Sequence, residues 1–220
     1  MKPRLSPKRN TAMTLFEVGI IVAVAMILVV VFFPRMGKLR RNNTTIICVN
    51  NLKQIGLAYR VWEGDNNDIL PMGISVTNGG AMETIQTGDA VAPFLVMSNE
   101  LSTPRILHCP ADPSHSQALS FTSPVGSRNV SYFVGVDVTN SSANPLLILS
   151  GDSDLELGGV PAKSSLHSFW TNDPVAWSAA RHIRKGNIGL ADGSVQTVNS
   201  SQLHTYFVAT GLATNRLAIP

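Results

Sequence analysis

An unbroken apolar run near the N-terminus constrains this chain more than any other feature. Residues 13–33 read MTLFEVGIIVAVAMILVVVFF and contain one charged residue, Glu17. As a helix that rises about 1.5 Å per residue, the run is roughly 30 Å long, the thickness of a bilayer's hydrocarbon core. The small-x-small cleavage site of a secretory signal peptide does not follow it. We therefore expect residues 13–33 to form a retained membrane helix.

The orientation of this helix does not follow from the charges beside it. Four basic residues precede the run and four follow it closely: Lys2, Arg4, Lys8 and Arg9 before it, and Arg35, Lys38, Arg40 and Arg41 after it. The positive-inside rule needs an asymmetry between the two sides. We infer a cytoplasmic N-terminus from the size of the C-terminal part and from the processing signal described below.

Glu17 needs a physical reason, because a carboxylate in an apolar membrane helix is costly and usually functional. In one interpretation it is a charge near the helix start, where the helix dipole favours it. In the other, the chain is cut after Ala12, and Glu17 becomes the counter-ion of the new amine at Met13. Between neighbouring chains, such a pair would set the axial register of stacked helices.

Residues 12–17, Ala-Met-Thr-Leu-Phe-Glu, resemble the class III signal of type IV pilins and type II secretion pseudopilins. The usual pattern there is Gly followed by Phe-Thr-Leu-Ile-Glu, so Ala12 and Met13 depart from it. The resemblance implies that prepilin peptidase cleaves between Ala12 and Met13 and methylates the amine of Met13. It also implies that Glu17 is the assembly glutamate and that Pro34 is a proline these proteins often carry.

The same resemblance implies partners and a location. The partners are prepilin peptidase, other pilin or pseudopilin subunits and an inner-membrane assembly platform. The location is the inner membrane, with a single pass and a periplasmic C-terminal domain, and afterwards the pilus or pseudopilus.

Charge gives no support for nucleic-acid binding. The whole chain has a formal charge of +3, but without residues 1–12 it has thirteen basic against fourteen acidic residues, a charge of −1. From Asn42 onward the counts are nine and thirteen, or −4. The exported part therefore lacks the basic stripe that a nucleic-acid interface needs.

Hydrophobic periodicity predicts that the helix continues beyond the apolar run. Apolar residues spaced by four and three form one helix face: Cys48, Leu52, Ile55, Tyr59 and Trp62. The turn cluster at residues 64–68 should end the helix. We divide the chain into a basic leader (1–12), a transmembrane and assembly helix (13–33), an amphipathic continuation (34–63) and an exported β-rich globular domain (64–220).

The globular part is rich in turn residues and short apolar runs, which favours β structure. Strands are expected near 73–77, 106–108, 131–136, 146–149, 187–190 and 195–198, with a helix near 90–101 and a short helix from Ser200. Asp192-Gly193 between the last two strands matches a type I′ hairpin turn. The fold class expected is α+β and pilin-like, a long N-terminal helix packed on an antiparallel sheet.

Two cysteines, Cys48 and Cys109, leave two alternatives open. In an exported domain they form a disulfide that closes a loop of about 60 residues. Otherwise they are two buried thiols that pack as small hydrophobic groups.

A second resemblance covers most of the chain outside its middle. Three motifs resemble prepilin-type proteins with an H-x9-DG domain, of the planctomycete and verrucomicrobial type. They are residues 50–58 (Asn-Asn-Leu-Lys-Gln-Ile-Gly-Leu-Ala), Cys109-Pro110-Ala111-Asp112, and His182 separated by nine residues from Asp192-Gly193. We interpret His182, Asp192 and Gly193 as a structural motif in which His182 hydrogen-bonds to the Asp192 turn. Acid–base chemistry by His182 and Asp192 is the competing interpretation.

No catalytic motif of the nucleophile-elbow, P-loop or dinucleotide type occurs, and we expect no enzyme activity and no cofactor. Zinc needs three or four ligands, so we expect no zinc site here. The other histidines show no ligand spacing relative to His182: His108, His115, His167 and His204. Calcium is the more reasonable ion, since hard cations take oxygen ligands. Its candidate ligands are Asp152, Asp154 and Glu156, with Asp65, Asn67 and Asp68 as a second cluster. Trp62 is expected in the core, and Trp170 and Trp177 in a partly exposed stretch.

The function expected is a structural subunit, processed by prepilin peptidase and assembled into a type IV pilus or a type II secretion pseudopilus. The alternative is a membrane-anchored adhesive or glycan-binding domain that does not polymerise.

Overall fold

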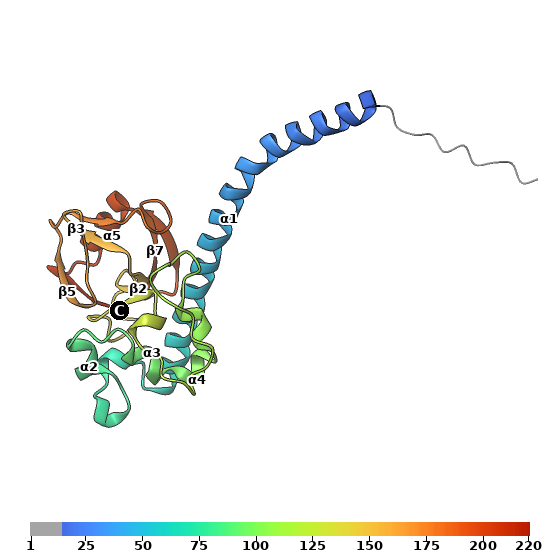
Figure 1. Ribbon diagram of the computed structural model, residues 1–220. Helices are drawn as coiled ribbons and strands as arrows, with labels where there is room; N and C mark the ends of the chain where they lie inside the picture. The colour runs from blue at the N-terminus through green and yellow to red at the C-terminus, as the bar shows by residue number, and fades with distance from the viewer. Residues whose placement is uncertain (1–14) are drawn as a thin grey trace, which may run out of the picture. The chain divides into compact units, whose positions relative to one another are not determined.

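The structure is a computed structural model that describes residues 15–220 and, within them, the side chains outside residues 32–42 (Figure 1). The chain divides into two units, residues 1–42 and 43–220. One helix, α1 (Leu15–Asp65), contributes residues to both. The cleavage site at Ala12 and Met13 lies outside the described residues.

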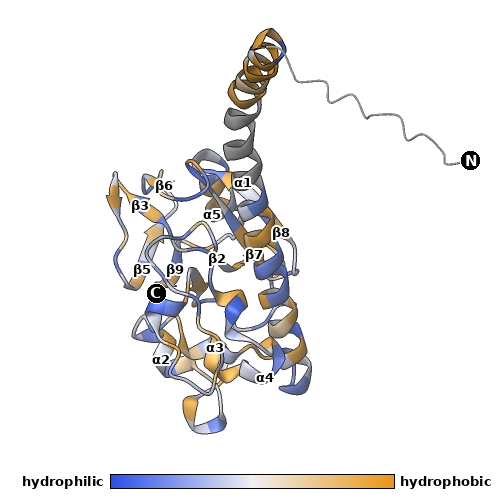
Figure 2. Ribbon diagram, turned by 45° about the vertical axis from the view of Figure 1, so that its right-hand side comes forward, coloured by the Kyte–Doolittle hydropathy of each residue, from blue (hydrophilic) through white to orange (hydrophobic). Residues whose placement is uncertain are grey.

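In the first unit, α1 presents apolar side chains to solvent. Every residue from Leu15 to Val31 is exposed, and nearly all of them are hydrophobic (Figure 2). Glu17 lies in the first turn of the helix. The helix continues through Pro34.

In the second unit, α1 buries the face that the sequence predicts. Cys48, Leu52, Ile55 and Tyr59 are each at most 1% exposed, and Trp62 is also buried. The helix ends at Asp65, and Asn67 and Asp68 follow with positive φ, a conformation that Asn and Asp tolerate better than most residues. The predicted end of the helix is confirmed.

Among residues 15–220, nine strands form two antiparallel sheets. The larger sheet has the order β5-β9-β1-β2-β7-β8, and the smaller has the order β4-β3-β6. The strands are β1 (Tyr132–Gly135), β2 (Ile148–Asp152), β3 (Leu155–Leu157), β4 (Val160–Pro161), β5 (Ser165–Trp170), β6 (Val175–Trp177), β7 (Lys185–Leu190), β8 (Val195–Asn199) and β9 (Thr214–Ile219).

The larger sheet is covered on both faces, and its central strand β1 is buried throughout. Side chains alternate between faces along a strand. Tyr132 and Val134 pack in the hydrophobic cluster that contains α1. Phe133 packs in a second cluster with Phe207 of α5 (Ser200–Ala209) and Trp177 of β6. The second half of α1 and α5 therefore cover opposite faces of this sheet.

Short helices replace two of the predicted strands. Residues 73–77 and 106–108 fall in or beside 3-10 turns, η1 (Pro71–Gly73), η2 (Val76–Asn78) and η3 (Pro104–Leu107). A proline begins η1 and η3, and the side chain of Thr103 caps η3 by accepting from the backbone of Arg105. Proline in a first turn and a Thr cap both favour a helical turn over a strand.

Three further short helices lie between η2 and η3, and one 3-10 turn follows η3. The predicted helix at 90–101 is two short helices, α3 (Ala92–Val96) and α4 (Ser98–Leu101), and α2 (Met82–Gln86) and η4 (Ser127–Asn129) were not predicted.

The hairpin between β7 and β8 is confirmed, but its turn is not type I′. A type I′ turn needs positive φ at both central residues. Gly193 has φ of 82°, whereas Asp192 has no positive φ. The amide of Gly193 donates to the carbonyl of Leu190, and the amide of Leu190 donates to the carbonyl of Ser194. This is the three-residue hairpin loop with glycine in the left-handed position.

The expected fold class is wrong. The protein has a mixed α/β architecture with two antiparallel sheets. We expected a single antiparallel sheet, packed on a long helix whose first half spans the membrane and whose second half is amphipathic. The second sheet forms because residues 154–177 pair among themselves, with Leu155–Leu157 hydrogen-bonded on both sides. In the part of the chain with described side chains, no helix is long and apolar enough to cross a membrane. In sequence, α1 loses its apolar character at Arg35 and is polar through residues 40–45.

Gly186 and Gly189 of β7 provide a matched test of this packing. A methyl group at Gly186 would overlap the ring of Trp177, whereas one at Gly189 would lie 3.7 Å from the nearest atom, the carbonyl oxygen of Ser150. We expect Gly186→Ala to lower the free energy of unfolding by about 1–3 kcal/mol. Gly189→Ala should change it by less than about 1 kcal/mol. Equal effects in urea denaturation would contradict the packing of β6 on β7.

Candidate functional site

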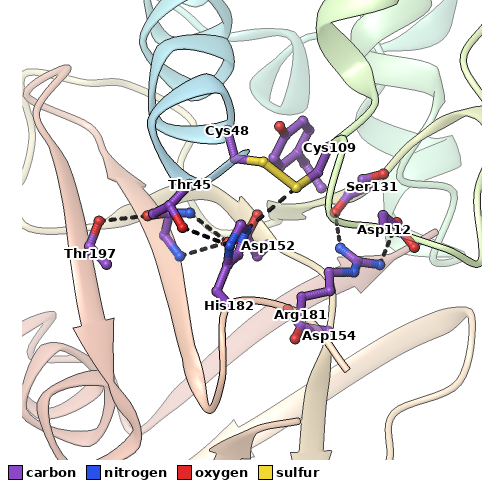
Figure 3. Close-up of polar contacts among 12 residues, drawn as sticks. Thr45, Cys48, Cys109, Asp112, Ser131, Asp152, Asp154, Arg181, His182 and Thr197 are labelled. Carbon is purple, nitrogen blue, oxygen red and sulfur yellow. Dashed lines mark hydrogen bonds and ion pairs between the residues drawn. A yellow bond between two sulfur atoms is a disulfide. The ribbon is translucent and has the colours of Figure 1, made fainter. Parts of the chain in front are cut away.

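A disulfide joins α1 to the loop after η3. Cys48 and Cys109 are bonded, with their Cα atoms 5.3 Å apart, and both residues are completely buried (Figure 3). Of the two alternatives for the cysteines, the structure therefore contains the bridge and not the free thiols. The bond fixes one end of the buried face of α1 to the segment that leads into β1.

His182 points at this disulfide from the loop before β7. Its Nε2 lies 3.4 Å from Cys109 Sγ and 3.6 Å from Asp152 Oδ2, and its Nδ1 lies 3.0 Å from Thr45 Oγ1. The side chain is 2% exposed. His182, Ile183 and Arg184 all have positive φ. Three consecutive non-glycine residues in this region are costly, so the surrounding contacts must hold the loop in place.

Asp152, at the end of β2, lies beside the His182 ring and is fully buried. Its Oδ2 accepts hydrogen bonds of 2.8 Å from the backbone and side-chain amides of Asn187, and Thr197 donates to the Asn187 side chain. Its Oδ1 is buried without a hydrogen-bond partner. Burial raises the pKa of Asp152 against the opposing effect of His182, and burial also lowers the pKa of His182.

Arg181, the neighbour of His182, extends to the other end of the Cys109–Asp112 segment. Its guanidinium forms an ion pair with Asp112 and donates to the Ser131 carbonyl and the Ser153 hydroxyl, and it is buried. Burial of Asp112 opposes its ionisation, but the hydrogen bond from His115 and the charge of Arg181 outweigh burial and hold the pKa of Asp112 below its usual range. Two consecutive residues therefore dock on Cys109 and Asp112 (Figure 3).

Asp192 and Gly193 occupy a different place from His182. The Arg60 guanidinium donates to the carbonyl of Asp192, and Gly193 lies against Gly56 of α1. The Asp192 carboxylate accepts from the Ser194 amide at 2.8 Å. Among the described residues, the hydrogen bonds of His182 go elsewhere, so the predicted bond from His182 to this turn is wrong.

The H-x9-DG spacing instead matches the two ends of β7. At one end, His182 contacts Thr45 and the disulfide, and at the other, the Asp192-Gly193 turn contacts Gly56 and Arg60. Both contacts are with α1, so the two ends of the motif hold the β7–β8 hairpin against this helix. Because the two side chains do not meet, they cannot act together as an acid–base pair in this arrangement.

The candidate calcium ligands do not converge. Asp154 Oδ2 accepts from the Ser178 hydroxyl at 3.2 Å, and Glu156 lies on β3 opposite Ala176 and Pro161. Within the described part of the chain, the acidic, histidine and cysteine ligand atoms that gather belong to Cys48, Cys109, Asp152 and His182. Asp65 and Asn67 line an open surface hollow near the end of α1, and Asp68 is exposed beside them in sequence.

Of the tryptophans, Trp62 is in the core as predicted. Trp177 is 2% exposed, because it packs in the second hydrophobic cluster over Gly186, so its predicted exposure is wrong. Trp170 is 59% exposed on the edge strand β5.

Sequence reasoning quoted Cys109-Pro-Ala-Asp112 without giving Asp112 a role, and it missed Arg181 altogether. A basic residue directly before His182 was the available signal, but its partner Asp112 is 69 positions away in sequence.

No protein-family model, curated protein or solved structure matches the chain.

The disulfide should dominate the stability of the globular unit. Closing a loop with a sequence separation of 61 residues is worth about 4 kcal/mol in the chain-entropy model. We expect a phosphine reductant in metal-free buffer to lower the free energy of unfolding by about that amount in urea titrations. The double variant Cys48→Ala/Cys109→Ala serves as the control and should be insensitive to the reductant. A wild-type chain equally insensitive to reductant would show that the bond contributes nothing.

Asp154 should make stability fall as the pH rises. Burial, followed by the charge of Asp152, raises the pKa of Asp154 to about 7. The folded state thus holds a proton that the unfolded state releases near pH 4, so stability is greatest below that pH and is lost up to about pH 7. This group alone contributes a loss of about 1.4 kcal/mol per pH unit between pH 5 and 7.

Replacement of the carboxyl isolates this effect. Asp154→Asn should flatten the dependence of the unfolding free energy on pH by that slope, whereas Asp68→Asn, at an exposed carboxyl, should retain it. A wild-type slope in Asp154→Asn would refute the assignment.

Proposed function

We propose that the protein is a structural subunit, cleaved by prepilin peptidase after Ala12 and assembled through residues 13–33 into a type IV pilus or a type II secretion pseudopilus. The observation that supports it is the exposure of every residue of α1 from Leu15 to Val31, nearly all of which are apolar. A helix that is apolar on every side is stable only when its whole circumference is covered. Copies of the same helix provide such cover without an additional component.

Before assembly, the proposed subunit is inserted in the inner membrane, with its N-terminus in the cytoplasm and residues 43–220 in the periplasm. Transfer of an apolar helix from lipid to a bundle of equally apolar helices gains little hydrophobic free energy, so a polar contact can direct it. The pair between Glu17 and the methylated amine of Met13 in a neighbouring subunit is such a contact. Its partners would be prepilin peptidase, other subunits and the inner-membrane assembly platform.

The disulfide is consistent with this location, because such bonds persist in the periplasm and outside the cell. The buried face of α1 from Cys48 to Trp62 makes the globular unit and its segment of helix one packed body. A subunit of this kind needs neither a catalytic cofactor nor calcium, and the cluster around His182 has a structural role in it.

Glu17 is the residue on which assembly should depend. We expect Glu17→Ala to reduce the fraction of protein in sheared or detergent-resistant filaments by about a hundredfold or more, because removal of one partner of a buried ion pair costs about 3 kcal/mol. Cleavage should continue, and the amount of subunit in the membrane should stay the same.

Asp65→Ala, at an exposed acid at the other end of α1, is the matched control and should assemble normally. Display of the chain at wild-type levels by both variants, with no filament in either, would favour the anchored binding domain over a polymerising subunit. Normal filaments from Glu17→Ala would contradict the assembly role of Glu17.

A further inference from the structure

Four side chains with metal-binding atoms meet at the disulfide. Their atoms, two sulfurs, a histidine nitrogen and a carboxylate oxygen, all lie within 4.8 Å of one another. They come from four separate places in the fold: Cys48 from α1, Cys109 from the loop after η3, Asp152 from β2 and His182 from the loop before β7. The tertiary structure, and no local motif, therefore creates this group.

Two distances within the group suit a tetrahedral zinc ion. Bonds of 2.0–2.3 Å at tetrahedral angles place neighbouring ligand atoms about 3.3–3.8 Å apart. His182 Nε2 lies 3.4 Å from Cys109 Sγ and 3.6 Å from Asp152 Oδ2. Two thiolates, an imidazole and a carboxylate are ligand types that zinc accepts together.

Surrounding polar groups hold two of these ligands, His182 and Asp152, in place. Thr45 Oγ1 lies 3.0 Å from His182 Nδ1, and a proton on Nδ1 leaves the Nε2 lone pair facing the centre. Asn187 fixes the carboxylate of Asp152 with two hydrogen bonds of 2.8 Å. Such partners orient ligands in known metal sites and raise their affinity.

One oxygen of the Asp152 carboxylate is not satisfied by the protein. Asp152 Oδ1 is buried without a hydrogen-bond partner, although a buried carboxylate oxygen is costly to leave unpaired. With the sulfurs joined, neither of them can donate a hydrogen bond to His182 or to Asp152. A cation at the centre would compensate the buried carboxylate and the imidazole lone pair at the same time.

We propose that the fold binds one Zn²⁺ when the disulfide is reduced, through Cys48, Cys109, Asp152 and His182. The same segments would then be cross-linked either by the disulfide or by the metal ion. A dithiol or phosphine reductant supplies two electrons to the S–S bond, and the two sulfurs take up two protons. Zinc then replaces these protons, which leave to solvent. The sulfurs must separate to about 3.7 Å, a distance that rotation of the two side chains can provide. This inference does not depend on assembly of the chain into filaments.

The test uses the full chain, solubilised in detergent, stripped of metal with a chelator and kept without oxygen. The phosphine-reduced chain is titrated with Co²⁺, which reports tetrahedral thiolate coordination by its absorption, and then with Zn²⁺. We expect one equivalent of Co²⁺ to bind, Zn²⁺ to displace it and the oxidised chain to bind none. His182→Ala and Asp152→Asn should each weaken binding at least about tenfold. His115→Ala, a neighbouring histidine outside the group, should bind as the wild type does.

Circular dichroism during the same titration covers the case in which reduction unfolds the chain. A reduced, unfolded chain should then refold on addition of one equivalent of Zn²⁺. The proposal is overturned if the reduced chain, folded or not, takes up no stoichiometric metal, if both ligand variants bind as the wild type does, or if the oxidised chain binds equally well.

Discussion

The fold of residues 43–220 depends on how the loop before β7 is held against α1 and the Cys109–Asp112 segment. Arg181 and His182 are adjacent, yet each reaches a separate partner, one a carboxylate and the other a disulfide sulfur. Both side chains are almost completely buried. Removal of one member of a buried charged pair is strongly destabilising, because the remaining charge keeps its desolvation cost. The loop must therefore keep all of these contacts together, even at the expense of three residues with positive φ.

The strands of the larger sheet extend from this loop. β7 begins after the loop, where His182 contacts Thr45, and it pairs with β8 after the Asp192-Gly193 turn, which contacts Arg60. β2 pairs with β7 and places Asp152 beside Nε2 of His182. β1 and β9 continue the sheet to β5. The disulfide closes the same junction covalently. One helix, one hairpin and one loop thus share a single buried polar centre.

Sequence patterns could predict what is local and periodic in this protein. The buried stripe from Cys48 to Trp62, the end of α1 and the β7–β8 hairpin follow from helix spacing and from turn residues. β9 could not be predicted, because its partners β1 and β5 are distant in sequence and its buried residues do not alternate cleanly. The second sheet could not be predicted, because its strands are only two or three residues long.

The polar site was predictable only in its members. His182 and the two cysteines stand out in the sequence, but their meeting with Asp152, and the pairing of Arg181 with Asp112, depend on contacts across 30 to 140 residues.

Two independent features of the chain support the proposed function. The exposed apolar side chains of α1 require a covering partner, and the disulfide-bearing globular unit is suited to an exported protein. Neither feature alone separates a filament subunit from another anchored protein. Processing of the N-terminus would separate these two classes of protein, since only a prepilin-type substrate is cut after Ala12 and methylated on the amine of Met13.

Mass analysis of the N-terminal peptide of the native protein therefore tests the central claim most directly. The account predicts a chain that begins at Met13 and carries one methyl group on its amine. A native chain that still begins at residue 1, or one cut beyond Phe33, would contradict it.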